Sequence, residues 1–538
     1  MIDTSLKTLG EITAEKLEQK IKRTVHQAGN KIQLLARRWD PKDGAPVFTK
    51  QGRYTSQGWT EWTQGFQFGM PLLVYEMDGD PWFLEYGRNS TRKFMAVHLT
   101  HRGVHDHGFN NISTYGNLYR LARTGRIQAD PWEVRYYALA LQVSGAVQAS
   151  RWKDLPGELG YIYSFNGPQS LFADTIRSLR SLAQAYLLGQ LLMEEQDARI
   201  NLLRRLLQHG ETTARYIVYH GSGRDRWDER GRTAHEAIFN PVNGSFRNPS
   251  TQQGYSPFST WTRGLAWVIL GFAEELEFLH SLREGEISSL NLPYFPTKEA
   301  AIQRFLETAR ATADFYIQHT PPDGIPYWDT GAPNLHHLDL NRPADPANPY
   351  EPVDSSAAAI AAQGLLRLGW FLETVQGTGE RPPKAETLAK AFTDAPNVAK
   401  TAGNSFLSSL FPKLRPGTPN ARDSHGSSPT PGTTGTSVSS GASEAANPYL
   451  AAGLRTALTL MEEPYLSVDP MHEGLLLHTV YHRPNGWDYV PPGSQVPHGE
   501  SCMWGDYHLL ELALFVKSLL STDPSEEPYR FFVKGDTV

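Results

Sequence analysis

The chain has 538 residues, with 51 Lys and Arg against 57 Asp and Glu, which gives a formal net charge of −6 at pH 7. Because no long run of one sign occurs, this mild acidity argues against a nucleic-acid or membrane-surface partner. The single cysteine, Cys502, cannot form an intramolecular disulfide or a cysteine-based zinc finger, so we expect a reducing compartment.

The beginning of the chain, residues 1–38, carries many charges and lacks the continuous apolar segment of a signal peptide. The longest apolar stretch, residues 265–273, is bounded by Arg263 and Glu274 and is too short to cross a bilayer. The sequence therefore predicts a soluble cytoplasmic protein.

Apolar residues recur at helical spacing along most of the chain. The clearest segments are residues 21–35, 137–147, 179–191, 265–276, 300–317, 355–375, 449–462 and 506–520. Alternating patterns typical of strands are scarce, and the best short candidates are residues 474–482 and 529–533. The chain is therefore predicted to be mostly helical, as a bundle, a solenoid or a closed α/α barrel, and no short solenoid repeat is visible.

Between these helices lie loops rich in aromatic residues, Gly, Pro and His, where functional side chains are often found. Residues 416–447 differ from these loops, because they are rich in Ser, Thr, Gly and Pro and contain no Leu, Ile or Phe. Such a tract cannot bury enough apolar surface to fold. Since helical sequence lies on both sides of it, we predict a disordered surface insertion.

The motif HDHGF at residues 105–109 places a carboxylate between two imidazoles, ahead of a predicted helix at residues 115–123. Asp106 is therefore a candidate catalytic acid, base or water-orienting group. The structural alternative is that Asp106 caps the helix or pairs with a histidine. A metal site is a third alternative, although the spacing matches no zinc signature; its ligands would be His101, His105 and His107.

Asp174 lies in the apolar opening of a predicted helix, within SLFADTIRSL at residues 170–179. Burial or a neighbouring carboxylate would raise the pKa of this side chain, whereas a helix N-terminus would lower it. The sequence leaves that sign open, and a helix-capping role is the alternative to catalysis.

The segment 252–267 combines Gln253, Arg263 and Trp267 ahead of an apolar helix. An arginine offers a planar charged fork to a carboxylate, a glutamine offers donors and acceptors to hydroxyls, and a tryptophan offers a flat wall to a sugar ring. Together they predict a binding surface for an anionic sugar. Trp267 and the preceding His235 are equally compatible with structural roles, whereas a charged Arg263 in an apolar stretch needs a partner or a ligand.

Taken in chain order, these segments resemble the unsaturated glucuronyl hydrolases, glycoside hydrolase family 88, and their relatives the unsaturated rhamnogalacturonyl hydrolases. The resemblance rests on HDHGF at 105–109, SFNGP at 164–168, FADT at 172–175, QQGYS at 252–256, WTRGLAW at 261–267, DSSA at 354–357 and WGDY at 504–507. Each motif is short, but their order along most of the chain makes the set specific.

The resemblance implies an all-α fold, an (α/α)6 barrel that forms one catalytic domain over residues 1–538, and a glycosidase that needs no metal or organic cofactor. Such enzymes remove a 4,5-unsaturated uronic acid from lyase-generated oligosaccharides by adding water across its double bond. Asp174 is then expected to be the general acid/base and Asp106 its partner. The expected substrate-binding residues are His235, Gln253, Arg263, Trp267, Phe165 and Trp62.

The chain also departs from the family pattern. Arg177 follows Asp174 where an apolar continuation is expected, and Gln67 stands where relatives often show an aromatic residue, so Trp59 or Trp62 is expected to compensate. Two alternatives stay open, an inverting glycosidase of the same fold and a catalytically inactive carbohydrate-binding protein. The parent polysaccharide and the oligomeric state are also left open.

Overall fold

The structure, a computed structural model, describes residues 14–58, 61–375, 447–521 and 527–535. The insertion predicted at residues 416–447 lies outside these ranges except for Asn447, whose side chain caps helix α16 (Pro448–Leu460). Trp59 also lies outside the described residues.

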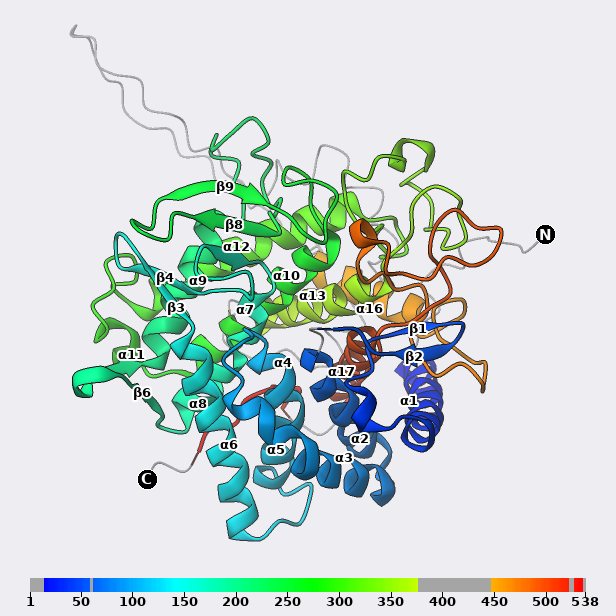
Figure 1. Ribbon diagram of the computed structural model, residues 1–538, viewed down its shortest axis with the longest axis horizontal. Coiled ribbons are helices and arrows are strands. Elements are labelled where there is room, and N and C mark those ends of the chain that lie inside the picture. The colour runs from blue at the N-terminus through cyan, green and yellow to red at the C-terminus, as the bar shows by residue number, and fades with distance from the viewer. Residues whose placement is uncertain (1–13, 59–60, 376–446, 522–526, 536–538) are drawn as a thin grey trace, which may run out of the picture.

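Outer and inner helices alternate along the chain (Figure 1). The outer helices are α1 (Ala14–Arg38), α3 (Pro81–Phe94), α6 (Pro131–Ser150), α9 (Leu202–Tyr216), α12 (Lys298–His319) and α16. The inner helices are α2 (Gln64–Asp78), the α4–η5–α5 series (His107–Asn111, Ile112–Gly116 and Asn117–Arg123), the pair α7 (Thr175–Ser178) and α8 (Arg180–Leu187), α10 (Thr262–Ser281), α13 (Ser355–Val375) and α17 (Met503–Leu520). Inner helices pack on their neighbours, and α17 packs on α2 to close the ring. This is the predicted all-α (α/α)6 barrel.

The inner helices α10 and α13 are apolar around most of their circumference, as expected of helices buried on all sides. Every residue of α10 from 262 to 279 is buried, and so is every residue of α13 from 355 to 371. Residues 357–362 of α13 are alanine except for one isoleucine, which favours helix formation and allows close packing against α10.

Short strands lie at one end of the barrel and on its outer side. Three antiparallel hairpins pair β1 (Phe48–Lys50) with β2 (Arg53–Thr55), β3 (Trp152–Leu155) with β4 (Leu159–Ile162), and β6 (Leu191–Met193) with β7 (Arg199–Asn201). A three-stranded antiparallel sheet has the order β5 (Ser170–Phe172), β8 (Glu236–Phe239), β9 (Phe246–Ser250). The remaining described elements are η2 (Pro41–Asp43), η3 (Glu61–Thr63), η4 (Met95–Thr100), η6 (Glu195–Asp197), α11 (Glu284–Ser288), η7 (Leu335–His337) and η8 (Arg483–Asn485).

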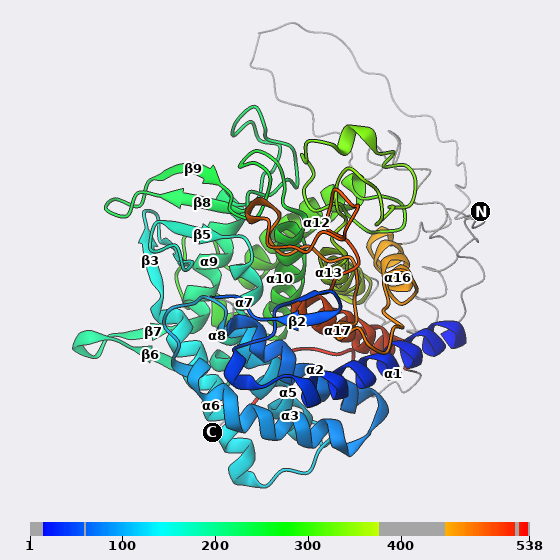
Figure 2. The same cartoon turned by 45° about the vertical axis from the view of Figure 1, so that its right-hand side comes forward.

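Three sequence predictions about local structure were wrong. Residues 474–482 make isolated bridges instead of a strand, and residues 529–533 form no strand. The helix predicted over 179–191 ends at Leu187, because Gly189 adopts a positive φ of 75° and the chain then enters the β6–β7 hairpin. That hairpin projects from the molecule in Figure 2.

None of the helices within the described ranges combines the length and apolar character needed to cross a membrane.

Candidate active site

The three-stranded sheet brings three of the predicted site residues to one edge. Phe172 of β5 lies opposite Glu236 of β8, which in turn lies opposite Ser250 of β9. Because neighbouring strands are antiparallel, the end of β5, the start of β8 and the end of β9 meet at the same edge. Asp174 follows β5, His235 precedes β8 and Gln253 follows β9, so segments far apart in sequence converge there.

Helix α7 joins the two predicted acidic residues. Asp174 precedes this helix, and Ser178 at its other end donates a hydrogen bond of 2.6 Å to the carbonyl oxygen of His105 and accepts one of 3.0 Å from the amide of Gly108. A Cβ atom on Gly108 would lie 2.2 Å from the carbonyl oxygen of Ser178, so only glycine permits this approach of α4 to α7. The loop that carries Asp106 is thereby fixed against the helix that follows Asp174.

The carboxylates of Asp106 and Asp174 both face the imidazole of His105. Its Nε2 atom lies 3.2 Å from Asp174 Oδ1 and 3.7 Å from Asp106 Oδ1. The two carboxylate oxygens are therefore at most about 7 Å apart, a distance within the range of paired glycosidase carboxylates. His105 and Asp106 are buried, while 13% of the Asp174 side chain stays exposed.

The surroundings move the pKa values of these carboxyl groups in opposite directions. Burial raises the pKa of Asp106 overall, and the charge of Asp174 acts in the same direction, although the charge of His105 and, to a smaller extent, those of Arg151 and His101 oppose the shift. Burial also acts to raise the pKa of Asp174, but the hydrogen bond and charge of His105, with smaller contributions from His235 and Arg263, lower it overall. In the free site Asp106 therefore keeps a proton at higher pH than Asp174 does.

His235 is a neutral hydrogen-bond donor in this site. Its Nδ1 atom accepts hydrogen bonds from the backbone amides of Gln252 (3.0 Å) and Gln253 (3.3 Å), which places the ring proton on Nε2. That Nε2 atom is buried and has no hydrogen-bond partner within the described part of the chain. Burial lowers the pKa of His235 to about 3, so the ring stays uncharged near neutral pH.

Arg263 already has protein partners on both terminal nitrogens. One terminal nitrogen pairs with Asp354 at 3.0 Å and also bonds the carbonyl of Val480, and the other bonds the carbonyl of Tyr481 at 2.7 Å and Gln253 Oε1 at 2.7 Å. The sequence predicted that Arg263 needs a partner or a ligand, and its charged partner in the structure is Asp354. Because Gln253 uses its oxygen on Arg263, the amide nitrogen of Gln253 is the group left to meet a ligand.

The predicted aromatic residues differ in how accessible they are. Phe165 is 50% exposed and stacks over the His105 ring, with centroids 6.0 Å apart. Trp62 is half-buried and stacks on Trp504 at 5.1 Å. Trp267 is only 2% exposed and packs between the rings of Phe109 and His508, so it supports the site from within the core. Gln67 is a buried residue of α2.

Two residues near the site were missed by sequence reasoning. Tyr481 packs on Trp504 at 4.9 Å, and burial together with the charge of Asp106 raises its pKa. Asp354 holds Arg263, as described above, and also accepts hydrogen bonds at the start of α13. Asp354 belongs to the DSSA motif, and this motif could have indicated that Asp354 is a site residue. Tyr481 lies in a segment with no motif, so the sequence offered no such indication.

The capping alternative raised for both acidic residues is not met, whereas the alternative that Asp106 pairs with a histidine is met by its approach of 3.7 Å to His105. Neither Asp106 nor Asp174 makes a side-chain capping bond, although each precedes a helix. Asp506, in the first turn of α17, accepts hydrogen bonds from the amides of Leu475 and Leu476 and thereby fixes a distant loop.

The metal alternative is also disfavoured by geometry. Both ring nitrogens of His107 are engaged, Nδ1 with Ser144 Oγ and Nε2 with the carbonyl oxygen of His101, each at 3.0 Å. Within the described ranges, no group of three or more His, Cys, Asp or Glu side chains has the arrangement of a metal site.

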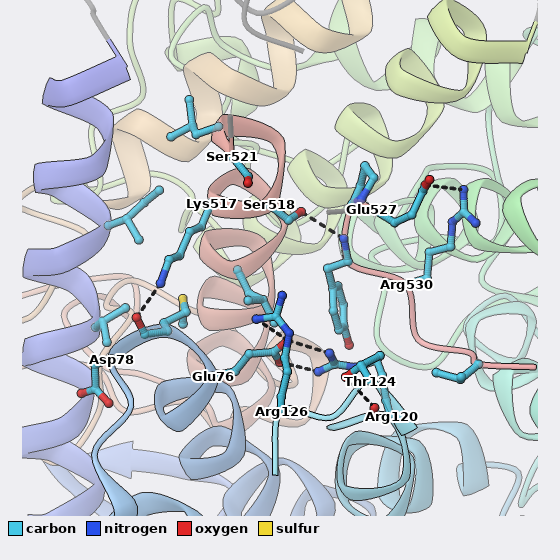
Figure 3. Close-up of a pocket in the computed structure, with 18 of the residues that line it drawn as sticks. Glu76, Asp78, Arg120, Thr124, Arg126, Lys517, Ser518, Ser521, Glu527 and Arg530 are labelled. Atoms are coloured by element: carbon cyan, nitrogen blue, oxygen red, sulfur yellow. Dashed lines mark hydrogen bonds and ion pairs between the residues drawn. The ribbon is translucent and has the colours of Figure 1, made fainter. Parts of the chain in front are cut away.

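A large cavity lies apart from these residues. It has a volume of about 1440 Å³ and opens between α1, the ends of α2 and α17, and residues 527–534 (Figure 3). Its wall includes Arg120, whose guanidinium forms a bidentate ion pair with the carboxylate of Glu76. None of the predicted site residues lines this cavity, so its size does not identify the candidate active site.

Comparison with known proteins gives a consistent set of sequence relatives. No family model matches the chain. An unsaturated glucuronyl hydrolase of Bacillus sp. strain GL1 is 28% identical over 357 residues, which is 65% of this chain and 75% of that protein. One from Formosa agariphila is 24% identical over 312 residues, 57% of this chain and 63% of its own length. An unsaturated chondroitin disaccharide hydrolase of Streptococcus agalactiae is 25% identical, over 59% of this chain and 65% of that protein.

Solved structures show the same fold. The crystal structure of the Bacillus sp. GL1 unsaturated glucuronyl hydrolase superposes with a TM-score of 0.59, covering 96% of this chain and 100% of that one at 20% identity. An unsaturated glucuronyl hydrolase specific for heparin gives a TM-score of 0.60 over 92% of this chain and 96% of that one, at 17% identity. By its sequence similarity and by its barrel, this chain is a relative of the unsaturated glucuronyl hydrolases.

Proposed function

We propose that this protein is an unsaturated glucuronyl hydrolase, a glycosidase that removes a 4,5-unsaturated uronic acid from the non-reducing end of oligosaccharides left by polysaccharide lyases. The observation that carries the proposal is the convergence of Asp106 and Asp174 on His105 inside a barrel shared with such enzymes. Asp-to-Asn variants of the Streptococcus agalactiae enzyme have been solved, one of them with an unsaturated uronyl disaccharide, which supports a reaction that uses aspartates.

The proposed reaction is hydration of a vinyl ether. A proton is added to C4 of the unsaturated ring and a water oxygen to C5, which converts the double bond into a hemiketal. The hemiketal then opens to a ketone at C5, and the hemiacetal formed at C1 releases the next sugar. The products are a keto-uronic acid and an oligosaccharide shorter by one unit, with one water consumed.

Within this reaction we assign Asp174 as the general acid/base and Asp106 as the group that orients water or the double bond. Asp174 is ionised in the free site at neutral pH, because its pKa lies below the ordinary value. A substrate carboxylate bound nearby would oppose the positive charges of His105 and Arg263 and so raise the pKa of Asp174. Substrate binding thus favours the protonated acid at the moment when a proton must be delivered.

The remaining predicted residues supply a binding surface. The Nε2 proton of His235 and the side-chain amide of Gln253 are suited to donate hydrogen bonds to substrate oxygens. Phe165 offers a half-exposed ring for stacking. Arg263 orients Gln253 and adds positive charge, whereas Trp62 and Trp267 stiffen the aromatic wall.

An absorbance assay on lyase-generated disaccharides tests the proposal. The panel includes heparin and chondroitin products, since relatives are named for each. We expect the absorbance of the conjugated double bond to disappear as the next sugar is released.

The alternatives give different results in the same assay. Release of sugar with the absorbance retained would indicate the inverting glycosidase. Binding without turnover would indicate a carbohydrate-binding protein. A cytoplasmic location and a single domain over residues 1–538 stay predictions from sequence.

A further inference from the structure

His105 occupies a position that the reaction scheme leaves without a role. It belongs to the HDHGF motif, in which Asp106 is the proposed partner of the general acid/base. Its ring is 1% exposed, and its Nε2 atom lies within 4 Å of both predicted catalytic carboxylates. No other described side chain is recorded in an ion pair with either of these two carboxylates.

The imidazole is held rigidly from both its backbone and its ring. The carbonyl oxygen of His105 accepts hydrogen bonds from Ser178 Oγ (2.6 Å) and Gln148 Nε2 (2.8 Å). The ring lies under Phe165, inclined by 22°, and meets the edge of Phe172 at 5.6 Å. Neither the loop nor the ring can rotate without breaking these contacts.

The proton on Nε2 is fixed by the same surroundings. Nδ1 of His105 is buried and has no hydrogen-bond partner among the residues the structure describes. A buried N–H without an acceptor is costly, so the neutral ring carries its proton on Nε2. In the charged ring Nε2 is protonated as well. In both states this N–H points at the carboxylates.

We propose that His105 is a positioning residue, whose Nε2–H holds Asp174 by a hydrogen bond and Asp106 by its proximity, so that the two carboxylates form one unit with a fixed geometry. The proposal rests on the function proposed above and extends it to a third side chain. In this arrangement the half-exposed ring of Phe165 has a second role, because it covers the imidazole and shields it from water.

Charges around His105 agree with this role. Asp106 and Asp174 face it from the α4 and α7 ends, Arg151 from the end of α6, His209 from α9 and His235 from the sheet edge. Burial lowers the pKa of His105, but the two carboxylates outweigh burial and Arg151 and raise it overall. By reciprocity, His105 stabilises the ionised form of Asp174.

The direct test replaces His105 by Phe, which keeps a ring under Phe165 and removes the N–H. We expect a ten- to hundredfold loss in kcat with little change in KM, because the proposed role of the ring is to position the carboxylates and not to bind substrate. His105→Asn, which retains a donor, should recover part of the loss. In carboxyl-labelled NMR titrations, Asp174 should titrate at higher pH in His105→Phe than in the wild type.

His319→Phe is the matched control. Its imidazole also stacks on a phenylalanine ring, Phe315 at 3.9 Å, and also lies near a carboxylate, that of Glu229 at 3.3 Å. This substitution should leave kcat and the titration of Asp174 unchanged. An effect equal to that of His105→Phe would mean that the loss is not specific to the carboxylate pair.

A reciprocal measurement does not depend on enzymatic activity or on the folding of His105→Phe. The titration of the His105 ring is followed by NMR in the wild type and in the isosteric Asp174→Asn, where its midpoint should fall because one favourable charge is lost. An unchanged midpoint would overturn the proposal even if the enzyme hydrolyses unsaturated uronides. A shifted midpoint in a protein without such activity would contradict the proposed function and keep the role of His105.

Discussion

The backbone amide of Ala173 donates a hydrogen bond of 2.9 Å to the carbonyl oxygen of His235. This bond continues the pairing of β5 with β8 by one step and fixes Asp174, the next residue, beside a histidine that is remote in sequence. The carboxyl proposed to be catalytic and a neutral donor are thus joined through backbone geometry, which does not depend on either side chain. Substitutions of these side chains are therefore expected to change chemistry more than folding.

Asp174→Asn should retain the fold and lose at least a hundredfold in kcat, because the amide cannot deliver a proton to C4. The change is isosteric, so the hydrogen-bonded sheet edge stays intact. The absorbance assay measures the loss, and a thermal melt checks the fold. Asp197→Asn on the projecting β6–β7 hairpin is the control, since asparagine tolerates its positive φ of 58°. Near-full turnover by Asp174→Asn would remove Asp174 from its assigned role.

Phe165→Ala should raise KM by roughly tenfold and leave stability nearly unchanged, because half of this ring is exposed and removing it takes away about 1–2 kcal/mol of apolar contact with a sugar. The comparison is Phe258→Ala, which removes a ring of similar exposure, 44%, from outside the predicted site. Equal KM values for the two variants would argue against a stacking platform at Phe165.

Gly108→Ala should disrupt the site through the backbone. The added Cβ would meet the carbonyl oxygen of Ser178 at 2.2 Å and force α4 away from α7, at a cost of about 1–3 kcal/mol in unfolding free energy. Activity should fall further than stability suggests, because Asp106 moves with α4. Gly285→Ala, where the added Cβ would meet no atom within 4 Å, is the control in urea unfolding. An undisturbed Gly108→Ala would show that the close approach is not required.

Asp354→Ala should be strongly destabilising, by about 3–5 kcal/mol, because it leaves the buried guanidinium of Arg263 without its counter-charge. The exposed pair of Asp339 and Arg342 provides the contrast, and Asp339→Ala should leave the unfolding free energy nearly unchanged. Denaturant unfolding of both variants measures the difference. Similar small changes would mean that the backbone carbonyls alone satisfy Arg263.

Buried neutral histidines such as His209 should make the free energy of unfolding depend on pH. Burial, reinforced by the charge of His105, lowers the pKa of His209 to about 3 from 6.5. Between these pH values the unfolded chain binds a proton that the folded chain does not, so stability falls as the pH falls through this window. His209→Gln should reduce the slope of unfolding free energy against pH by up to about 1.4 kcal/mol per pH unit.

Urea unfolding at several pH values between 7 and 4 would check this slope. A slope in His209→Gln equal to that of the wild type would show that this histidine is not linked to unfolding.

Much of the barrel could be predicted from the sequence, because apolar residues that recur at helical spacing over long segments indicate helices. The segment predicted at 355–375 matches α13, and that predicted at 506–520 lies within α17. The strands that build the site are three to five residues long and carry no clear alternation, so β5, β8 and β9 were missed. Their pairing is decided by contacts distant in sequence, which local patterns do not encode.

The sequence indicated which residue types form the candidate site, but it did not indicate which of these side chains contact one another. The sequence indicated that Arg263 needs a partner, but it did not reveal that Asp354 is this partner, ninety-one residues away. It also gave no means of telling that Trp267 is enclosed by Phe109 and His508. His105 was visible in its motif, yet its position between two carboxylates depends on the packing of α4 against α7.

Proton NMR of the reaction in D2O, with a lyase-generated unsaturated disaccharide as substrate, tests the central claim most directly. The account predicts that the vinyl proton signal of C4 disappears and that the keto-uronic acid product carries one deuterium from solvent at C4. Release of an unsaturated uronic acid with its C4–C5 double bond intact, formed by attack at the anomeric carbon, would contradict it.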